Sequence, residues 1–300
     1  MKDIGILRGY PRIREQFGQI ADYVALVRPF TLVAPFLVGI FGSLLAIQSG
    51  MAYSFLTILF VAVTLSLSQA VGQCLNQAVG VEEDRINKPY RPLPSGKLTE
   101  KEAYGLAVIL AGIAIWRAFK INYVFGLGIL LLLLFAVLYN TNIRKKVGLN
   151  LLVMAVSRGF LPILIIWSAY HKPPFGGLPL YIALFAFLWV VAWQPTKDLK
   201  DVEGDGVSGI MTLPVVYGVE NTRQWIKWTS LLPFALLTGL LVSGTLSFPC
   251  AILFVLLGFR VIGLRGLDKE VEGMENTQAW IVFYLGLGCI YILFLIAELF

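Results

Sequence analysis

The sequence predicts an all-α fold, a polytopic membrane bundle of about nine transmembrane helices. Hydrophobic residues make up 58% of the 300 residues and charged residues only 14%, whereas soluble domains average about 25% charged residues. Successive apolar segments are each long enough to cross about 30 Å of hydrocarbon. Basic residues gather in alternate loops between these segments, which is typical of the cytoplasmic loops of a membrane protein.

The segment before the first span predicts a helix that lies on the membrane surface. Residues 11–27 carry apolar side chains at helical spacing, with charged side chains between them, as in interfacial helices. We therefore expect residues 1–28 to form a cytoplasmic interfacial segment. A signal peptide is disfavoured, because the apolar run starts late and no small-residue cleavage site follows a short hydrophobic region.

The predicted spans follow in order, and the whole chain, residues 1–300, is expected to form one domain. The spans cover residues 29–49, 53–75, 102–118, 122–142, 150–169, 178–196, 228–246, 248–266 and 277–298. Thr99 and Glu102 match a T-x-x-E capping box at the start of the third span. Prolines at positions 89, 92 and 94 disfavour helix before it, so residues 86–98 should form a loop.

The basic residues also predict the orientation of the chain. They precede the first span and follow the second, fourth, sixth and eighth spans. By the positive-inside rule, the N-terminus and the charged loops at residues 76–101 and 197–227 are cytoplasmic, and the C-terminus is outside. The net charge of +6 is thereby explained by topology, and it does not indicate nucleic-acid binding.

Composition excludes several kinds of site. His171 is the only histidine, which argues against haem bis-ligation, di-iron sites, zinc–histidine clusters and a serine–histidine relay. The three cysteines lack C-x-x-C spacing, so a thiol–metal site or a disulfide framework is not expected. Glycine pairs at 126/128 and 286/288 lie inside apolar runs without a G-x-G-x-x-G pattern. We interpret them as sites of close helix packing.

An acidic stretch follows the second span. On a helix, Asn76, Gly80 and Asp84 would share one face, because they are four residues apart, and Glu83 would lie close to that face. Basic residues and the Pro-rich loop follow directly. Acidic residues are also common at solvated helix ends, which is the alternative interpretation of this stretch taken alone.

A second acidic stretch follows the sixth span. Asp201 and Asp205 are four residues apart and Asp198 is three residues before Asp201. A pair four residues apart spans about 6 Å along a helix axis, which suits one hard cation. Magnesium usually takes one or two carboxylates together with substrate phosphates. Two such stretches on one face of the membrane favour a magnesium-bound diphosphate over solvated helix ends.

The stretch from Asn76 to Gly96 resembles the N-x-x-x-D-x-x-x-D…RPLPSG signature of the UbiA-type intramembrane prenyltransferases. The stretch from Asp198 to Asp205, followed by Gly209 and residues 212–214, resembles their second motif, D-x-x-x-D. The likeness extends to residues 28–31, to Tyr139 before a basic cluster, and to the number and orientation of the spans. It therefore covers nearly the whole chain.

The resemblance implies a central cavity open to the cytoplasmic side and to lipid. It implies Mg²⁺-dependent transfer of a prenyl group, expected to be long, such as geranylgeranyl, from a polyprenyl diphosphate to a hydrophobic or aromatic acceptor. Magnesium and basic side chains would stabilise the leaving diphosphate, and an apolar cavity would keep the allylic cation from water. Quinone precursors, chlorin carboxylates and glycerol-type lipid alcohols all serve as acceptors in the family, so the acceptor stays open.

By position in the motifs, the resemblance also implies roles for individual residues. Magnesium ligands are expected at Asn76, Glu83, Asp84, Asp201 and Asp205. Diphosphate contacts are expected at Arg28, Arg91, Lys145 and Arg158, and catalytic roles at Asp84, Tyr139, Asp198 and Asp201. For Arg91 and Lys145 the alternative is a loop charge that sets topology. Arg158 lies about two turns into a span, where a lone charge is costly; it should pair with an anion or extend to the membrane surface.

One position departs from the family pattern. Gly80 stands at the middle position of the first motif, which is usually Asp in this family, so one expected ligand is missing. Glu83 or Glu82 would have to supply the missing carboxylate. Two other functions stay open: a transporter or lipid-handling protein and, because of Gly80, a weakly active homologue that binds prenyl diphosphate.

Overall fold

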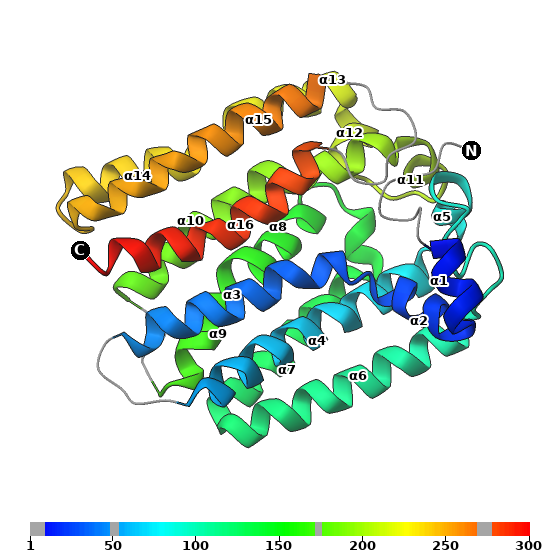
Figure 1. Cartoon of the computed structure of the whole chain (residues 1–300). Helices are drawn as coiled ribbons and strands as arrows, with labels where there is room; N and C mark the ends of the chain where they lie inside the picture. Colours follow the sequence, from blue (N-terminus) through cyan, green and yellow to red (C-terminus); the bar gives the residue numbers. More distant parts are fainter. Residues whose placement is uncertain (1–9, 49–53, 172–175, 269–277) are drawn as a thin grey trace.

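The chain folds into a bundle of long helices, with short helices gathered at one end (Figure 1). The computed structural model describes residues 10–48, 54–171, 176–268 and 278–300, and within these ranges it contains helices and no strand. The predicted all-α class is therefore confirmed. Helix α1 lies at one end of the bundle and the C-terminus at the opposite end (Figure 1).

The N-terminal half of the chain forms helices α1 to α7. They are α1 (Tyr10–Phe17), α2 (Gln19–Val27), α3 (Phe30–Ile47), α4 (Phe55–Val79), α5 (Val81–Asn87), α6 (Glu100–Ile121) and α7 (Tyr123–Tyr139). Helix α4 packs against α3, α6 and α7. It is therefore the central helix of this half.

The C-terminal half contains shorter and more irregular helices. They are η1 (Asn142–Lys145), α8 (Leu149–Ala155), η2 (Val156–Phe160), α9 (Leu161–Ala169), α10 (Leu178–Trp193), η3 (Gln194–Lys200), α11 (Val202–Val207), α12 (Leu213–Tyr217), α13 (Val219–Thr229), α14 (Leu232–Val242), η4 (Phe248–Val255), α15 (Leu256–Asp268) and α16 (Gln278–Ala297). Helix α10 packs against α9, α14 and α16, and both of its tryptophans, Trp189 and Trp193, are fully buried.

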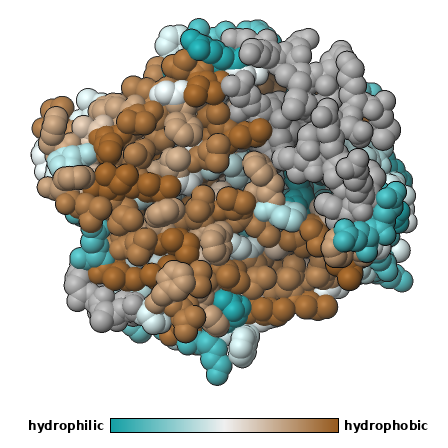
Figure 2. Space-filling model, in the orientation of Figure 1, coloured by the Kyte–Doolittle hydropathy of each residue, from teal (hydrophilic) through white to brown (hydrophobic). Residues whose placement is uncertain are grey.

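The apolar helices are long enough to cross a bilayer. Among the described residues, seven helical segments have the length and composition of membrane spans, and two shorter apolar helices, Tyr123–Tyr139 and Ile281–Ala297, accompany them. On α6, the side chains of Val108 and Trp116 are 72% and 59% exposed. Apolar side chains cover the middle of the face in Figure 2, and hydrophilic ones lie mainly at its margins. Such a surface suits lipid, so the chain is an integral membrane protein.

The segment before the first span differs from the single helix predicted over residues 11–27. Gly18 takes a φ of +55°, a backbone conformation that glycine adopts readily, and it separates α1 from α2. Asp22 is buried and its carboxylate accepts a 3.2 Å hydrogen bond from Arg14 Nε. Part of the segment therefore packs on the bundle. Residues 1–9 of the predicted segment lie outside the described ranges.

The start of α6 agrees with the sequence pattern. Glu102 N–H donates to Thr99 Oγ1 at 3.3 Å, and Thr99 N–H donates to Glu102 Oε2 at 2.7 Å, so the predicted capping box is confirmed. Before it, residues 88–99 form turns, in which Ser95 Oγ donates to the Arg91 carbonyl at 2.6 Å. The loop that the prolines predict is present.

Glycines bring several helices into close contact. A Cβ atom at Gly128 would lie 2.9 Å from Ile165 of α9, and one at Gly286 of α16 would overlap the Trp189 ring of α10. These contacts confirm that the glycine pairs serve helix packing. Without a strong hydrophobic force between helices in lipid, small residues at such contacts allow the backbones to approach.

We predict that Gly286→Ala destabilises the bundle, because the added methyl group forces α16 away from the Trp189 ring. The expected loss is about 1–3 kcal/mol, measured as a lower thermal unfolding midpoint in detergent. Gly112→Ala on α6 is the matched control, since its Cβ would meet no atom within 4 Å. Equal melting temperatures for wild type and Gly286→Ala would contradict this packing.

Candidate active site

A cavity extends from the end of the bundle that carries α5 and α11 into the space between the long helices. Its volume of about 180 Å³ is room for roughly a dozen water molecules, enough for a polar head group. Its lining is polar at one end and apolar further in. Leu65 of α4, for example, lies eleven residues before Asn76, about 16 Å along the helix axis.

The spacing predicted one continuous helix over the first acidic stretch, but the structure has two helices there. Helix α4 ends at Gly80, whose φ and ψ are −100° and 23°, and α5 begins at the next residue. The four-residue hydrogen bonds continue across the break, because Asp84 N–H donates to the Gly80 carbonyl at 3.0 Å. Asn76, Glu83 and Asp84 all line the cavity. The kink therefore leaves the predicted grouping of these side chains intact.

Glu83, and not Glu82, faces the cavity. Glu82 is exposed and pairs with Arg85 on the surface at 2.7 Å, whereas Glu83 is buried and pairs with Arg144. Burial raises the pKa of the Glu83 carboxyl, and the Arg144 charge lowers it in part. Gly80 makes room for this arrangement, because a Cβ atom there would lie 2.5 Å from Glu83 Oε1. The Glu83 carboxylate thus lies directly beside Gly80.

The second acidic stretch is built from two short helices. Asp198 lies in η3, Asp201 at the junction, and Asp205 in α11. Backbone hydrogen bonds maintain the turn, from Asp201 N–H to the Asp198 carbonyl at 3.1 Å and from Asp205 N–H to the Asp201 carbonyl at 2.9 Å. All three aspartates line the same cavity as the first stretch.

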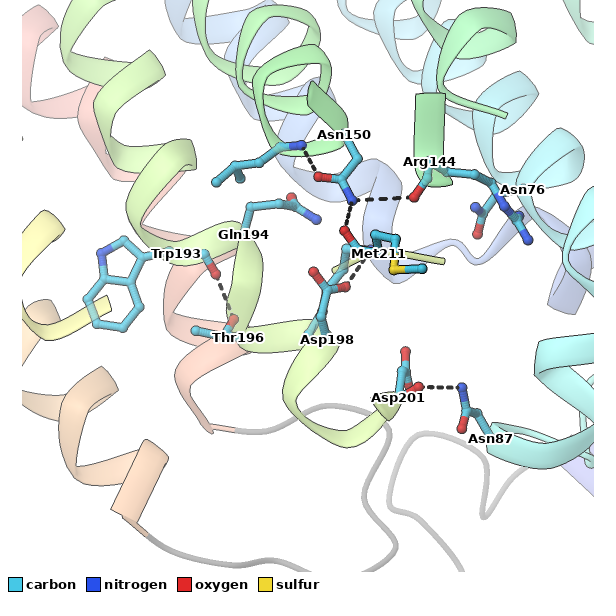
Figure 3. A network of polar contacts seen from close by, with 12 residues as sticks. Asn76, Asn87, Arg144, Asn150, Trp193, Gln194, Thr196, Asp198, Asp201 and Met211 are labelled. Atoms are coloured by element: carbon cyan, nitrogen blue, oxygen red, sulfur yellow. Dashed lines mark hydrogen bonds and ion pairs between the residues drawn. The ribbon is translucent and has the colours of Figure 1, made fainter. Parts of the chain in front are cut away.

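Asn87 joins the two acidic stretches. Its Nδ2 donates to the Asp201 carbonyl at 3.0 Å, and its Oδ1 accepts from Gly204 N–H at 3.0 Å. Figure 3 shows the Asn87 side chain pointing at Asp201. A Cβ atom at Gly204 would lie 2.5 Å from Asn87 Nδ2, so only glycine allows this approach. Neither residue was predicted from the sequence, although Asn87 follows the first motif by only three positions.

Basic side chains neutralise four of the carboxylates. Lys88 Nζ lies 2.5 Å from Asp201 Oδ2, Arg91 Nη1 lies 2.7 Å from Asp84 Oδ2, and Lys197 Nζ lies 3.0 Å from Asp198 Oδ1; Arg144 pairs with Glu83. Of these cations the sequence analysis assigned only Arg91 to the site. The remaining three had been interpreted as loop charges that set topology.

Asp205 is different, because it forms no ion pair within the described residues although it is buried. Burial and the nearby charges of Asp198 and Asp201 raise the pKa of Asp205 to about 7. A cation at this position would relieve the repulsion between the three carboxylates. The second stretch therefore has the electrostatics of a cation site.

The available ligand atoms also suit magnesium. Asn76 Nδ2 donates to Asn140 Oδ1 at 3.3 Å, and Asn140 Nδ2 donates to the Ala136 carbonyl at 2.8 Å, so the Asn76 Oδ1 oxygen is left for a ligand. With the aspartates, this gives the oxygen donors that hard cations prefer. Among the described residues, no three acidic, histidine or cysteine side chains are close enough to hold a metal by themselves. Substrate phosphates would have to complete the coordination.

The other predicted residues lie as follows. Arg28, Tyr139 and Arg158 line the cavity. Arg28 has a φ of +56°, which is uncommon for a residue other than glycine, and its Nη1 donates to Gln73 Oε1 at 3.3 Å. Lys145, expected to contact the diphosphate, is exposed and does not line the cavity, whereas its neighbour Arg144 does. Asn150 binds the Arg144 carbonyl at 3.4 Å (Figure 3), which helps to place Arg144.

The chain shares its sequence and fold with known membrane proteins. It is 35% identical over 211 residues to a digeranylgeranylglyceryl phosphate synthase from Thermococcus sibiricus, covering 69% of this chain and 72% of the relative. A synthase of the same name from Saccharolobus solfataricus is 27% identical over 87% of this chain and 92% of its own length. The fold resembles that of a UbiA homologue from Archaeoglobus fulgidus solved with DMAPP and Mg²⁺, with a TM-score of 0.68, 16% identity, and coverage of 93% and 98%.

A family model extends this similarity across the site. The model of the UbiA prenyltransferase family matches residues 32–284, a range that includes both acidic stretches, the Asn87 hydrogen bonds and most of the residues that line the cavity. The two motifs that suggested the family in the sequence thus lie in one cavity of a bundle with the same fold. The chain belongs to the UbiA prenyltransferase family, and it is a prenyltransferase.

Proposed function

We propose that this prenyltransferase transfers a geranylgeranyl group from its diphosphate to a glyceryl phosphate lipid, with Mg²⁺ as cofactor. The observation that carries the proposal is the pair of acidic stretches held across one cavity by Asn87. The relatives named above, which are called digeranylgeranylglyceryl phosphate synthases, support this donor and acceptor. The charged end of the bundle would be cytoplasmic, as the positive-inside rule predicts.

Magnesium would be held by Asn76, Asp84, Asp201 and Asp205. Glu83, which lies beside Gly80, would supply the carboxylate that the family usually has at position 80. The bound metal would neutralise charge on the leaving diphosphate. The paired cations of the cavity, Lys88, Arg91, Arg144 and Lys197, would turn from their carboxylates to the phosphate oxygens. Tyr139 would donate to the same group. The donor is thus held by charges from both stretches.

The transfer breaks the bond between the prenyl carbon and the diphosphate oxygen, and its electron pair leaves with the diphosphate. The acceptor hydroxyl oxygen then bonds to the allylic carbon and releases its proton. Asp198 would accept this proton once Lys197 turns to the diphosphate; its position in the cavity lining supports this role. Products are the ether lipid and diphosphate, so atoms and charges balance.

The inner part of the cavity would hold the isoprenoid chain. Val38, Leu65, Leu132, Phe135 and Leu287 form this apolar lining. Such walls exclude water, which would otherwise capture the allylic cation. Phe135 can also stabilise a cation through its ring. A transporter or lipid-handling protein needs no such combination of acidic stretches and apolar chamber, so the enzyme is favoured.

We predict that Asp84→Ala and Asp201→Ala each lower prenyl transfer by about 100- to 1000-fold, because each removes a carboxylate that would hold Mg²⁺ against the diphosphate. Release of labelled diphosphate in the presence of Mg²⁺ is the measurement. Glu82→Gln and Glu203→Gln are the matched controls, since both carboxylates are exposed and neither lines the cavity. Full activity of both aspartate variants would contradict the site. Donor binding without release in wild type would indicate the weakly active homologue instead.

A second prediction follows from the close contact between Gly80 and Glu83. Glu83→Gln should lower transfer by about 10- to 100-fold. Gly80→Asp should also lower it, because the new side chain overlaps the Glu83 carboxylate. The double variant Gly80→Asp with Glu83→Ala should be more active than Gly80→Asp alone, since the acidic group then returns to position 80 without the overlap with Glu83. The Asn76 carbonyl oxygen, 2.7 Å from a Cβ at position 80, has to shift in both variants. If the losses of transfer activity from the two substitutions are instead additive in the double variant, Glu83 does not supply the carboxylate expected at position 80.

A further inference from the structure

The cavity contains a second basic region, around Arg158 in the middle of the fifth span. This span changes to a π-turn, η2, at Val156–Phe160, directly before Pro162. Proline has no N–H to donate to the carbonyl four residues earlier, which here is that of Arg158, and its ring crowds that carbonyl. Such interruptions produce π-turns, often at functional sites. The turn places Arg158 on the cavity lining.

Close packing holds this turn against α10. A Cβ atom at Gly159 would lie 2.7 Å from the Ala186 carbonyl oxygen and from Phe187 Cα. The two backbones therefore touch, and Arg158 comes beside the end of α10. There its Nη1 donates to Gln194 Oε1 at 3.0 Å and to Tyr284 Oη at 3.3 Å. Both partners are neutral.

Arg158 thus differs from the four cations that pair with the acidic stretches. It forms no ion pair within the described residues, and its Nε and Nη2 groups make no hydrogen bond there. A cation within a span is costly unless an anion accompanies it. Gln194 is 2% exposed and its Nε2 also lacks a partner in the described part of the chain. Donors for a ligand therefore remain unused on both side chains.

Arg158 lies at the inner end of the diphosphate site, close enough to Lys197 for the two positive charges to repel each other. Its partner Gln194 precedes Asp198 by four residues on η3 (Figure 3), which is about 6–8 Å along the helix. Arg158 therefore lies further into the bundle than Asp198 and Asp201. A three-carbon glycerol unit with its hydroxyl near Asp198 would place a phosphate at this distance.

We propose that Arg158 binds the phosphate monoester of the acceptor lipid, while the acidic stretches hold the donor. The proposal rests on the proposed function and deepens it, since it assigns a separate anion site to the acceptor. The planar guanidinium, already oriented through Nη1, presents Nη2 and Nε as a fork for two phosphate oxygens. Gln194 Nε2 adds a donor beside it. Arg158 is thereby a specificity-determining residue for phosphorylated acceptors.

A pair of acceptors tests this assignment: geranylgeranylglyceryl phosphate and the same lipid alcohol without phosphate. Wild type should use the phosphorylated acceptor more efficiently. Arg158→Gln should lower kcat/KM for it by about 10- to 100-fold and leave the neutral acceptor and the KM of the donor nearly unchanged. Calorimetry should show that the phosphorylated acceptor binds wild type without Mg²⁺ and binds Arg158→Gln more weakly.

Arg260→Gln is the matched control, because Arg260 also lies in a span and its Nε donates to a neutral partner, Ser230 Oγ, at 2.9 Å, but it does not line the cavity. Arg158→Lys keeps the charge and should retain part of the preference. If Arg158→Gln raises the donor KM with both acceptors, Arg158 binds the donor and the proposal is wrong. Equal use of both acceptors by wild type would also overturn it, while Mg²⁺-dependent diphosphate release would still support the proposed function.

If Arg158→Gln does not fold, binding of the two lipids to wild type decides the question. Equal affinities would reject the phosphate site. Absence of Mg²⁺-dependent release with either acceptor would instead overturn the proposed function itself.

Discussion

The two hydrogen bonds of the Asn87 side chain connect α5 to the η3–α11 segment, and the site depends on this connection. Asn87 binds the backbone at Asp201 and Gly204, more than a hundred residues away in the sequence. Gly204 lacks the Cβ atom that would block the approach. Each acidic stretch alone would be an ordinary helix end. Together they face one cavity whose inner part is apolar.

The balance of charge in the cavity follows from this arrangement. Bringing Glu83, Asp84, Asp198 and Asp201 together would be unfavourable without the four cations that pair with them. Buried ion pairs contribute little net stability, because desolvation offsets their attraction. These ion pairs instead position the lysine and arginine side chains where a diphosphate would bind. Asp205 and Arg158 lie outside this pairing, so a carboxylate and a guanidinium remain for ligands.

The sequence predicted the helical class, the spans, the capping box at Thr99 and the grouping of the aspartates, because these depend on composition and local spacing. It did not predict the helix break at Gly80, the pairing of Glu83 with Arg144 or the choice of Arg144 over Lys145. Neighbouring residues on a helix point about 100° apart, so packing decides which of two adjacent charges enters the cavity. Asn87 was missed for a related reason, because its partners come from a distant part of the chain.

The position of bound divalent ions tests most directly whether both acidic stretches hold a single diphosphate. The measurement is anomalous X-ray scattering from crystals grown with Mn²⁺ in place of Mg²⁺ and a non-cleavable thio analogue of geranylgeranyl diphosphate. We expect manganese peaks within the cavity, with oxygen ligands from Asp84 on one side and Asp201 on the other, bridged by the diphosphate. Manganese bound by only one acidic stretch, or located outside the cavity, would contradict the claim that both stretches hold a single diphosphate.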